Sequence, residues 1–271
     1  MTIVDDFLAL HVKGRPLLIP NPWDIGSARL LAALGFRALA TTSSGFAASV
    51  GRLDGRTTRE EALGHAASLV RATSLPVSAD LEHGYADDPA DIAQLVRDAA
   101  AVGLAGCSIE DSTGRDDEPI YEAGFAAERI AAAAKAAHEG GHRIVLTARA
   151  ENYLHGRPDL ADTIARLRSY QEAGADVLYA PGLSDPADIA AVVDAVDRPV
   201  NMLARPGAPS VAELAKLGVA RVSVGGAFAY AAIDGLVTAA RELMDEGTYG
   251  YAAASGRGRA FVAEALASYA D

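Results

Sequence analysis

The sequence predicts an α/β fold, a (β/α)8 barrel of the TIM type. Short, near-continuous apolar runs alternate with segments whose apolar residues recur at helical spacing, which is typical of a parallel sheet covered by helices. Eight such strand–helix pairs fit between residues 17 and 246, a usual length for one barrel. Gly35, Gly103, Gly174 and Gly218 each end an expected helix just before an expected strand, where a C-terminal glycine is common.

The expected strands are short runs of aliphatic, β-branched and small residues bounded by turn formers. They cover residues 17–20, 37–42, 76–80, 106–111, 143–149, 176–181, 199–203 and 221–225. The expected helices follow them, and several start at a capping Thr or Ser or at a proline. They cover residues 26–34, 58–73, 89–102, 125–139, 160–173, 186–196, 210–217 and 228–246.

The composition indicates one folded domain and excludes several partner classes. Half of the residues are hydrophobic and 22% are charged, so the chain is not disordered. A net charge of −12 argues against nucleic acid and anionic membranes as partners. The single Cys107 forms no internal disulfide and is interpreted as a small buried strand residue rather than a nucleophile. No signal peptide or membrane span is expected, so we expect a soluble, cytoplasmic protein.

The domain prediction assigns residues 1–246 to a catalytic barrel. Residues 247–271 are expected to form a hinge and a C-terminal helix, not a separate domain. The stretch Gly247–Arg259 contains Ser255-Gly256-Arg257-Gly258 and is interpreted as flexible, leading into a helix over residues 260–269. Because a detached last helix after a barrel often packs on a neighbouring subunit, we expect a homodimer or homotetramer.

Acidic residues follow two neighbouring expected strands. Asp80 and Glu82 follow the third strand, and Glu110 and Asp111 close the fourth. Chemistry collects at the C-terminal ends of barrel strands, and converging carboxylates repel one another unless a cation joins them. Hard divalent cations prefer oxygen ligands. The sequence therefore predicts a magnesium site at the mouth of the barrel, where Mn²⁺ could substitute.

Other polar residues at the strand ends suit an anionic ligand that chelates the ion. Arg149 ends the fifth strand and offers a guanidinium to a carboxylate. Thr42, Ser43 and Ser44 follow the second strand and offer N–H and O–H donors. The sequence has no glycine-rich dinucleotide motif and no Walker loop.

Several short motifs occur together in the order and spacing of one known superfamily. They are Asn21-Pro22-Trp23-Asp24, Thr42-Ser43-Ser44, Ser49-Val50-Gly51-Arg52-Leu53-Asp54, Asp80-Leu81-Glu82-His83-Gly84-Tyr85, Ile109-Glu110-Asp111, Thr147-Ala148-Arg149 and Pro199-Val200-Asn201-Met202. Over about residues 15–235 the chain resembles the isocitrate lyase/phosphoenolpyruvate mutase superfamily. This resemblance implies a barrel whose eighth helix is exchanged between subunits, and a site that binds Mg²⁺ and an oxo or enol-forming carboxylate.

The resemblance also implies a role for each matching residue. Asp80 would be the direct magnesium ligand, while Glu82 and Glu110 would hold the ion through its waters. Asp54 would lie on a loop that approaches the metal. The residues implied to bind the substrate are Thr42, Ser43, Ser44, Arg149 and Asn201, with Arg149 on its carboxylate.

The chain departs from the superfamily in the loop after the fourth strand. Lyases of this kind carry Lys-Lys-Cys-Gly-His there, and the mutases and hydrolases carry a Lys and an Asn. Here residues 112–119 read Ser-Thr-Gly-Arg-Asp-Asp-Glu-Pro. Isocitrate cleavage is therefore not expected, since the acid that protonates the leaving succinate is missing.

The remaining equipment favours a Mg²⁺-dependent carbon–carbon lyase. It would decarboxylate or cleave by retro-aldol a small α-oxo or 2-hydroxy carboxylic acid through an enolate. Arg149, Asp54 and Tyr85 are the predicted catalytic residues, and a retro-aldol could also use His83 or Glu151 as its base. The alternatives are P–C bond chemistry on phosphonopyruvate or phosphoenolpyruvate, and a non-catalytic relative that binds an oxo acid.

Overall fold

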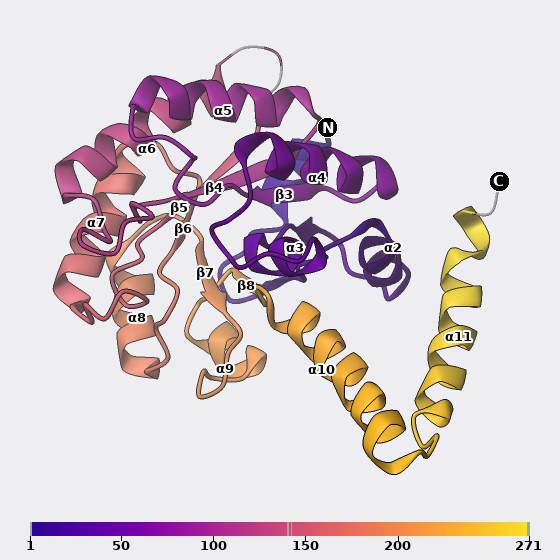
Figure 1. The fold of residues 1–271 in the computed structure, drawn as a ribbon. Helices are drawn as coiled ribbons and strands as arrows, with labels where there is room; N and C mark the ends of the chain where they lie inside the picture. The colour runs from indigo at the N-terminus through magenta and orange to yellow at the C-terminus, as the bar shows by residue number, and fades with distance from the viewer. Residues whose placement is uncertain (1, 140, 142, 270–271) are drawn as a thin grey trace.

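Eight parallel strands form a nearly closed barrel surrounded by helices, as the sequence predicts (Figure 1). The computed structural model describes residues 2–139, 141 and 143–269. The strands are β1 Leu17–Ile19, β2 Leu39–Ala40, β3 Val77–Asp80, β4 Gly106–Glu110, β5 Val145–Arg149, β6 Val177–Tyr179, β7 Val200–Leu203 and β8 Arg221–Ser223. Their order is β1-β8-β7-β6-β5-β4-β3-β2.

The helices of the barrel match the expected segments within a few residues, the last helix begins earlier than expected, and two short helices, α1 and α3, were not expected. The α-helices are α1 Ile3–Ala9, α2 Ile25–Ala33, α3 Ser43–Ser49, α4 Arg59–Ala72, α5 Pro89–Ala101, α6 Ala123–His138, α7 Leu160–Glu172, α8 Pro186–Ala195, α9 Val211–Lys216, α10 Ala227–Arg241 and α11 Ala252–Leu266. A π-helical turn, Glu242–Glu246, extends α10, and a 3-10 turn, Ala267–Tyr269, ends α11.

Asn21 closes the barrel between the first, second and last strands. Its Oδ1 accepts hydrogen bonds from the N–H groups of Val224 and Gly225, both at 2.9 Å, and its Nδ2 donates to the carbonyl of Thr41 at 2.8 Å. The N–H of Ala40 also donates to the carbonyl of Pro20 at 3.0 Å. One amide side chain thus joins the strand ends at the mouth where the ligand cavity opens.

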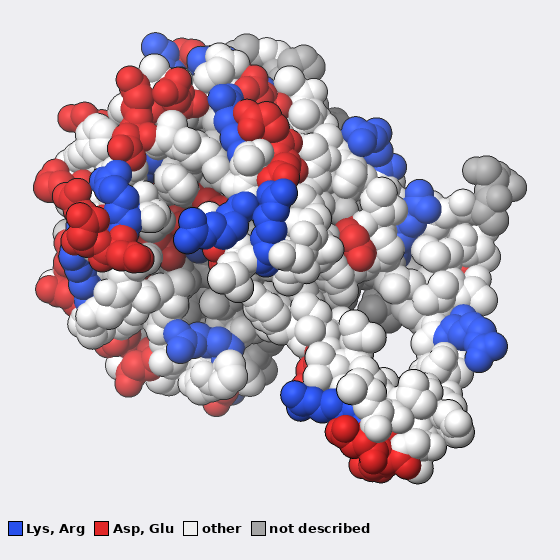
Figure 2. Space-filling model, viewed as in Figure 1, with Lys and Arg blue, Asp and Glu red and all other residues white. Residues whose placement is uncertain are grey.

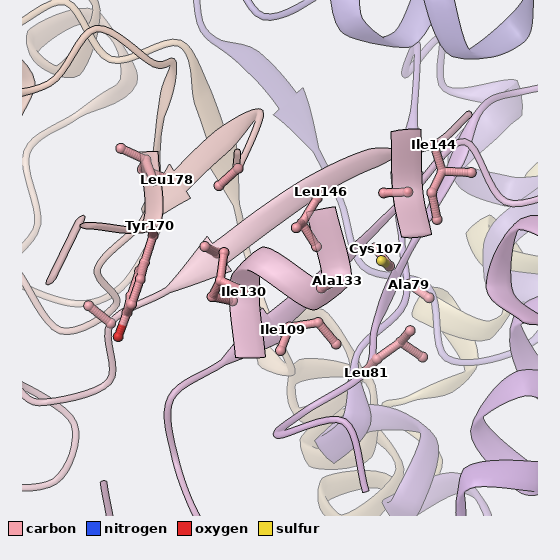
Figure 3. Packing of buried hydrophobic residues seen from close by; sticks show 14 of the residues in the cluster. Ala79, Leu81, Cys107, Ile109, Ile130, Ala133, Ile144, Leu146, Tyr170 and Leu178 are labelled. Atoms are coloured by element: carbon pink, nitrogen blue, oxygen red, sulfur yellow. The ribbon is translucent and has the colours of Figure 1, made fainter. Parts of the chain in front are cut away.

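The strands alternate between two environments. Outward side chains such as Ala79, Cys107, Ile109 and Leu146 pack against Ile130 and the other apolar residues of the surrounding helices (Figure 3). Cys107 is fully buried there, as expected, and burial raises the pKa of its thiol to about 12. Several inward positions near the C-terminal ends of the strands carry polar side chains instead, among them Ser78, Asp80, Ser108 and Arg149, and these line the ligand cavity.

The helix α1 packs at the opposite end of the barrel from the strand ends that carry the acidic residues. Its Phe7 is fully buried with Leu17, Ile19, Val145 and Val177 in a small second core. The N-cap Thr2 accepts a hydrogen bond from the N–H of Asp5 at 3.2 Å. The cavity therefore opens only toward the C-terminal ends of the strands in the described chain.

The C-terminal segment leaves the barrel as an arm, residues 227–269, made of α10, the π-helical turn and α11 (Figure 1). The expected hinge over Gly247–Arg259 is wrong in extent, because α11 already begins at Ala252 and includes Gly256 and Gly258. Both glycines face open space, and the alanines between Ala252 and Ala263 favour helix strongly enough to include them. None of the helices in the described residues is long and apolar enough to cross a membrane.

Candidate active site

The candidate site is a cavity at the C-terminal ends of the strands. It encloses about 820 Å³ of empty space, counted out to its open mouth. Its polar lining comes from nearly every strand. The polar residues are Asn21, Thr41, Thr42, Ser43, Ser44, Asp54, Ser78, Asp80, Ser108, Arg149, Tyr179, Asn201, Arg221 and Ser223. A second hollow beside it is lined by Glu82, His83, Glu110 and Glu151 and shares Ser43, Asp54 and Arg149 with the first.

Arg149 joins the carboxylates that the sequence singled out. Its Nη1 lies 2.9 Å from Asp80 Oδ1, and its Nη2 lies 3.0 Å from Glu110 Oε2. Its Nε donates to Glu151 Oε1 at 2.9 Å, so Glu151 is a partner of Arg149. Burial lowers the pKa of Arg149, but the carboxylates of Glu110, Glu151 and Asp80 outweigh burial and raise it well above its usual value. The guanidinium is therefore a permanent cation at the centre of the acidic cluster.

Asp80 is oriented by neutral donors as well as by the guanidinium. The N–H of Ser43 donates to its Oδ2 at 3.3 Å, and the hydroxyl of Ser108 donates to its Oδ1 at 3.5 Å. Its own N–H donates to the hydroxyl of Thr41 at 2.8 Å, which fixes the backbone at the end of β3. Glu110 accepts a hydrogen bond from the hydroxyl of Ser112 at 2.7 Å.

The turn after β3 holds Glu82 in a constrained position. Glu82 and Tyr85 have φ angles of 50° and 59°, in the left-handed region that side chains other than glycine rarely adopt. The hydroxyl of Tyr85 donates to Glu82 Oε1 at 2.9 Å. Burial and the neighbouring Glu82 raise the pKa of Tyr85, so its phenol stays protonated. This geometry suits Tyr85 to positioning Glu82 better than to acting as a base.

Burial makes the acidic cluster prone to protonation. It raises the pKa of Glu82 to about 7 with help from the charge of Asp80, and it raises the pKa of Glu110. Burial also raises the pKa of Glu151 to about 8. Asp54, on the loop before α4, has a pKa raised by burial. One guanidinium does not balance these five acidic groups, Asp80 included, which leaves room for additional positive charge.

Asp111 turns away from the cavity because successive strand residues face opposite sides. Its Oδ2 accepts hydrogen bonds from Tyr170 at 2.6 Å and from Arg166 at 3.1 Å. Its Oδ1 accepts from the N–H of Glu151 at 2.8 Å. Asp111 therefore supports the backbone that presents Arg149 and Glu151.

The three hydroxyl residues after β2 lie at the start of α3, a helix that was not expected from the sequence. Thr42 caps α3 by accepting from the N–H of Gly45 at 3.3 Å, and its hydroxyl lies 3.2 Å from that of Ser44. Ser43 and Ser44 occupy the first turn. All three line the cavity with Asp80 and Arg149. A capping Thr was a signal in the sequence for this short helix.

The donors present fit a magnesium ion held mainly through water. Asp80 and Glu110 both reach one cation from neighbouring strands, and the nearby groups are hard oxygen donors. In the described part of the chain, no group of three or more acidic, His or Cys side chains is gathered tightly enough to hold an ion directly. Mg²⁺ keeps several of its waters in proteins, so one direct ligand, Asp80, is compatible with this spacing.

Comparison with known proteins decides the family. The family model described as phosphoenolpyruvate phosphomutase matches residues 7–244. The chain belongs to this family. Its fold and motifs are those of the phosphoenolpyruvate mutase/isocitrate lyase superfamily.

Family members similar to this chain include proteins with and without a named activity. A crystal structure from Burkholderia cenocepacia, provisionally described as a lyase/mutase, shares 53% identity and a TM-score of 0.92 over 95% of this chain and 93% of its own. An uncharacterized Mycobacterium tuberculosis protein is 38% identical over 88% of this chain and 89% of its own. An oxaloacetate decarboxylase of Pseudomonas aeruginosa is 31% identical over 87% of this chain and 83% of its own.

Arg221 is a cavity residue that was not expected from the sequence. Arg221 begins β8 and is only 5% exposed, yet it lines the cavity with Asn201 and Ser223. The signal was the alternation of polar and apolar residues in Arg221-Val222-Ser223 and Val200-Asn201-Met202. Period-two alternation places the polar members on one face of each strand.

Proposed function

We propose that this protein is a Mg²⁺-dependent lyase that cleaves a carbon–carbon bond of a small α-oxo or 2-hydroxy carboxylic acid. The observation that carries the proposal is the convergence of Asp80 and Glu110 on Arg149, which lines both the cavity and the hollow beside it. The similarity to an oxaloacetate decarboxylase over most of both chains supports it. When bound, the ion would stabilise negative charge on the oxo oxygen as the bond breaks and an enolate forms.

The chain's own residues would bind and orient the acid. Arg149 presents two N–H donors that now hold Asp80 and Glu110, and the fork geometry suits a carboxylate equally well. Glu151 keeps the third side of the guanidinium fixed through Nε. Ser43 and Ser44 offer donors at the other side of the cavity. Decarboxylation requires no base from the protein, which fits a loop over residues 112–119 without Lys, Cys or His.

The test is turnover by the purified protein. Oxaloacetate, 2-hydroxy acids with branched or unbranched chains, and phosphonopyruvate are each assayed with Mg²⁺, with Mn²⁺ and with a chelator. We expect metal-dependent loss of a carbon fragment from an oxo or hydroxy acid, abolished by Asp80→Asn. Asp91→Asn removes the same charge from the exposed face of α5 and should leave turnover unchanged. Phosphate release from phosphonopyruvate alone would refute the lyase in favour of P–C chemistry, and tight binding without turnover would indicate a binding protein.

We also propose that the protein is a homo-oligomer in which a second copy covers the arm. The arm exposes many large apolar side chains. They are Phe228, Tyr230, Ile233, Leu236, Val237, Leu243, Met244, Tyr249 and Val262. Its visible surface is largely uncharged, apart from basic residues on α11 and a charged cluster at the corner between the helices (Figure 2). A contiguous apolar surface of this kind marks an interaction site, and a projecting arm can pair with its own copy about a two-fold axis.

A further inference from the structure

Arg221 is a buried cation whose hydrogen-bond partners are all neutral. Its Nε donates to Asn201 Oδ1 at 2.9 Å, and its Nη2 donates to the hydroxyl of Thr147 at 3.0 Å. Its Nη1 lies 3.3 Å from His11 Nε2. His11 is neutral, because burial and the charge of Arg221 lower its pKa to about 3. Among the described residues, no carboxylate forms an ion pair with this guanidinium.

The neighbouring groups hold the guanidinium in one orientation. The amide of Asn201 donates to the hydroxyl of Ser223 at 3.1 Å, so its oxygen is the atom that faces Arg221. His11 donates from Nδ1 to the carbonyl of Phe7 at 2.9 Å, which leaves Nε2 as an acceptor. Burial, together with the nearby charge of Arg149, lowers the pKa of Arg221 to about 10. Arg221 is therefore still charged at neutral pH.

Arg221 lies deeper in the cavity than the acidic cluster. Its partner Thr147 precedes Arg149 by two residues on β5, so both face the barrel interior. Two residues of strand correspond to about 7 Å. Arg149 therefore stands at the level of Asp80 and Glu110, and Arg221 one layer beneath it. The cavity lining also includes the hydroxyl residues Ser78 and Ser108.

A buried charge without a counter-ion is unfavourable, and it becomes favourable when an anion reaches it. If this position served packing alone, an apolar or neutral polar residue would fill it at a lower free-energy cost than a buried charge. In the acidic upper layer, by contrast, Arg149 is already matched by three carboxylates. Among the described residues of the cavity, the positive charge that no carboxylate neutralises is therefore that of Arg221, at the cavity floor.

We propose that Arg221, unpaired at the cavity floor beneath Arg149, binds a second carboxylate of the substrate and so selects an α-oxo or 2-hydroxy dicarboxylate over the matching monocarboxylate. This inference rests on the proposed function, because the first carboxylate and the oxo group are assigned to the upper layer. The second carboxylate accepts hydrogen bonds from the guanidinium N–H groups that face the cavity. Asn201 acts as a positioning residue, since it fixes the guanidinium.

The test compares ligands that differ only in the terminal carboxylate. Binding to the Mg²⁺-loaded protein is measured by calorimetry for oxaloacetate against 2-oxobutanoate and for 2-oxoglutarate against 2-oxopentanoate. In each monocarboxylate a methyl group replaces the distal carboxylate. In the unmodified protein, at least one dicarboxylate should bind about tenfold or more tightly than its partner, as a charge-assisted hydrogen bond to a buried group implies. Equal affinity within both pairs overturns the proposal without any variant.

Two variants locate the effect. R221Q removes the charge and keeps some hydrogen bonding, so the dicarboxylate should lose about tenfold or more in affinity while the monocarboxylate changes little. R221K should retain part of the preference. Oxalate serves as the control ligand, because it is too short to reach the floor, and its affinity should stay within about twofold in R221Q. An equal loss for all ligands would show a merely structural role and overturn the proposal.

The outcomes separate this inference from the proposed function. Selective loss of the dicarboxylate in R221Q with no turnover of any acid leaves the Arg221 assignment intact and refutes the lyase. Turnover of a dicarboxylate that is insensitive to R221Q leaves the lyase intact and refutes the assignment. Failure of the unmodified protein to bind any of these acids with Mg²⁺ refutes both.

Discussion

Arg149 makes three ion pairs, and two of them involve the carboxylates that a metal would need. Asp80 and Glu110 each lie within 3.0 Å of its guanidinium. A divalent ion and this guanidinium both carry positive charge, and they would compete for the same carboxylate oxygens. Binding of the ion would therefore require Arg149 to lose these contacts. A substrate carboxylate would then replace them as the partner of the guanidinium.

Replacing Arg149 should change metal and ligand affinity in opposite directions. In Arg149→Met, Mg²⁺ alone should bind several-fold more tightly, because no cation competes for Asp80 and Glu110. Oxalate should bind the Mg²⁺-loaded variant about 10- to 100-fold more weakly, since charge-assisted hydrogen bonds are lost. Calorimetric titration of each ligand measures both effects. Arg97→Met, on the outer face of α5, is the control, and weaker Mg²⁺ binding in Arg149→Met would contradict the competition.

His11 should make the stability of the protein depend on pH below neutrality. Burial lowers its pKa from 6.5 in the unfolded chain to about 3 in the fold, so only the unfolded chain takes up a proton between these values. The resulting stabilisation is complete above pH 6.5 and is lost as pH falls, by about 1.4 kcal/mol per pH unit. Denaturant unfolding at pH 7 and pH 5 measures it. His11→Gln should show a smaller difference between the two pH values, and an unchanged difference would refute the assignment.

At the scale of elements, the turn between β3 and α5 carries the most constraint. Gly84 has a φ angle of 84°, and a Cβ at this position would lie 2.3 Å from Ile92 Cδ1. Glu82 and Tyr85, on either side, also have positive φ angles. The turn thus places Glu82 beside the cavity at a cost in backbone strain.

Alanine should therefore have opposite effects at two glycines. Gly84→Ala should destabilise the protein by about 2 kcal/mol or more, through the positive φ angle and the contact with Ile92. Gly64→Ala is the matched control, because Gly64 lies in α4 with open space around it. That change should stabilise by up to about 1 kcal/mol, the difference in helix propensity. Thermal unfolding compares the two, and a neutral Gly84→Ala would show that the turn relaxes freely.

The corner between α10 and α11 explains why the expected hinge is short. Glu242 accepts hydrogen bonds from the hydroxyl of Thr248 at 2.6 Å and from the N–H of Tyr251 at 3.2 Å. Gly247 reverses the chain with a φ angle of 66°. A side chain that precedes the turn thus holds the backbone at the residue where the next helix begins. The glycines of residues 256–258 indicated a flexible segment, and no local pattern in the sequence indicates the contact of Glu242.

In a single copy of the protein, the arm exposes large apolar side chains to solvent. It departs from the barrel at α10 and returns toward α2 through α11 (Figure 1). The ring of Tyr269 lies 4.2 Å from the guanidinium carbon of Arg29, which anchors the far end. Between these two points, Leu236 and Met244 are 69% and 82% exposed.

A charge on the arm should weaken self-association. Leu236→Asp should shift the oligomer toward smaller species at micromolar concentration, because an unpaired charge in an apolar interface is unfavourable. Sedimentation velocity measures the assembly state of both proteins. Leu34→Asp, at an exposed apolar position outside the arm, should leave the assembly unchanged. A monomeric unmodified protein at these concentrations would refute the second copy as the occupant of the arm.

The sequence predicts the barrel, because alternating apolar runs and amphipathic helices can pack in few other ways, and the parallel strands of one barrel end at a common mouth. It therefore also placed Asp80, Glu110 and Arg149 near one another, and their contacts of 2.9 and 3.0 Å bear this out. The roles assigned to these residues stay predictions.

The polar contacts that cross the barrel could not be predicted from the sequence. The pairing of Arg221 with Asn201, Thr147 and His11 joins residues up to 210 positions apart, and no local pattern encodes such a contact. The same holds for the support that Asp111 receives from Arg166 on α7. Side-chain direction depends on strand register and shear, which are set by the closure of the whole sheet. For that reason the charge at the cavity floor became visible only in the folded chain.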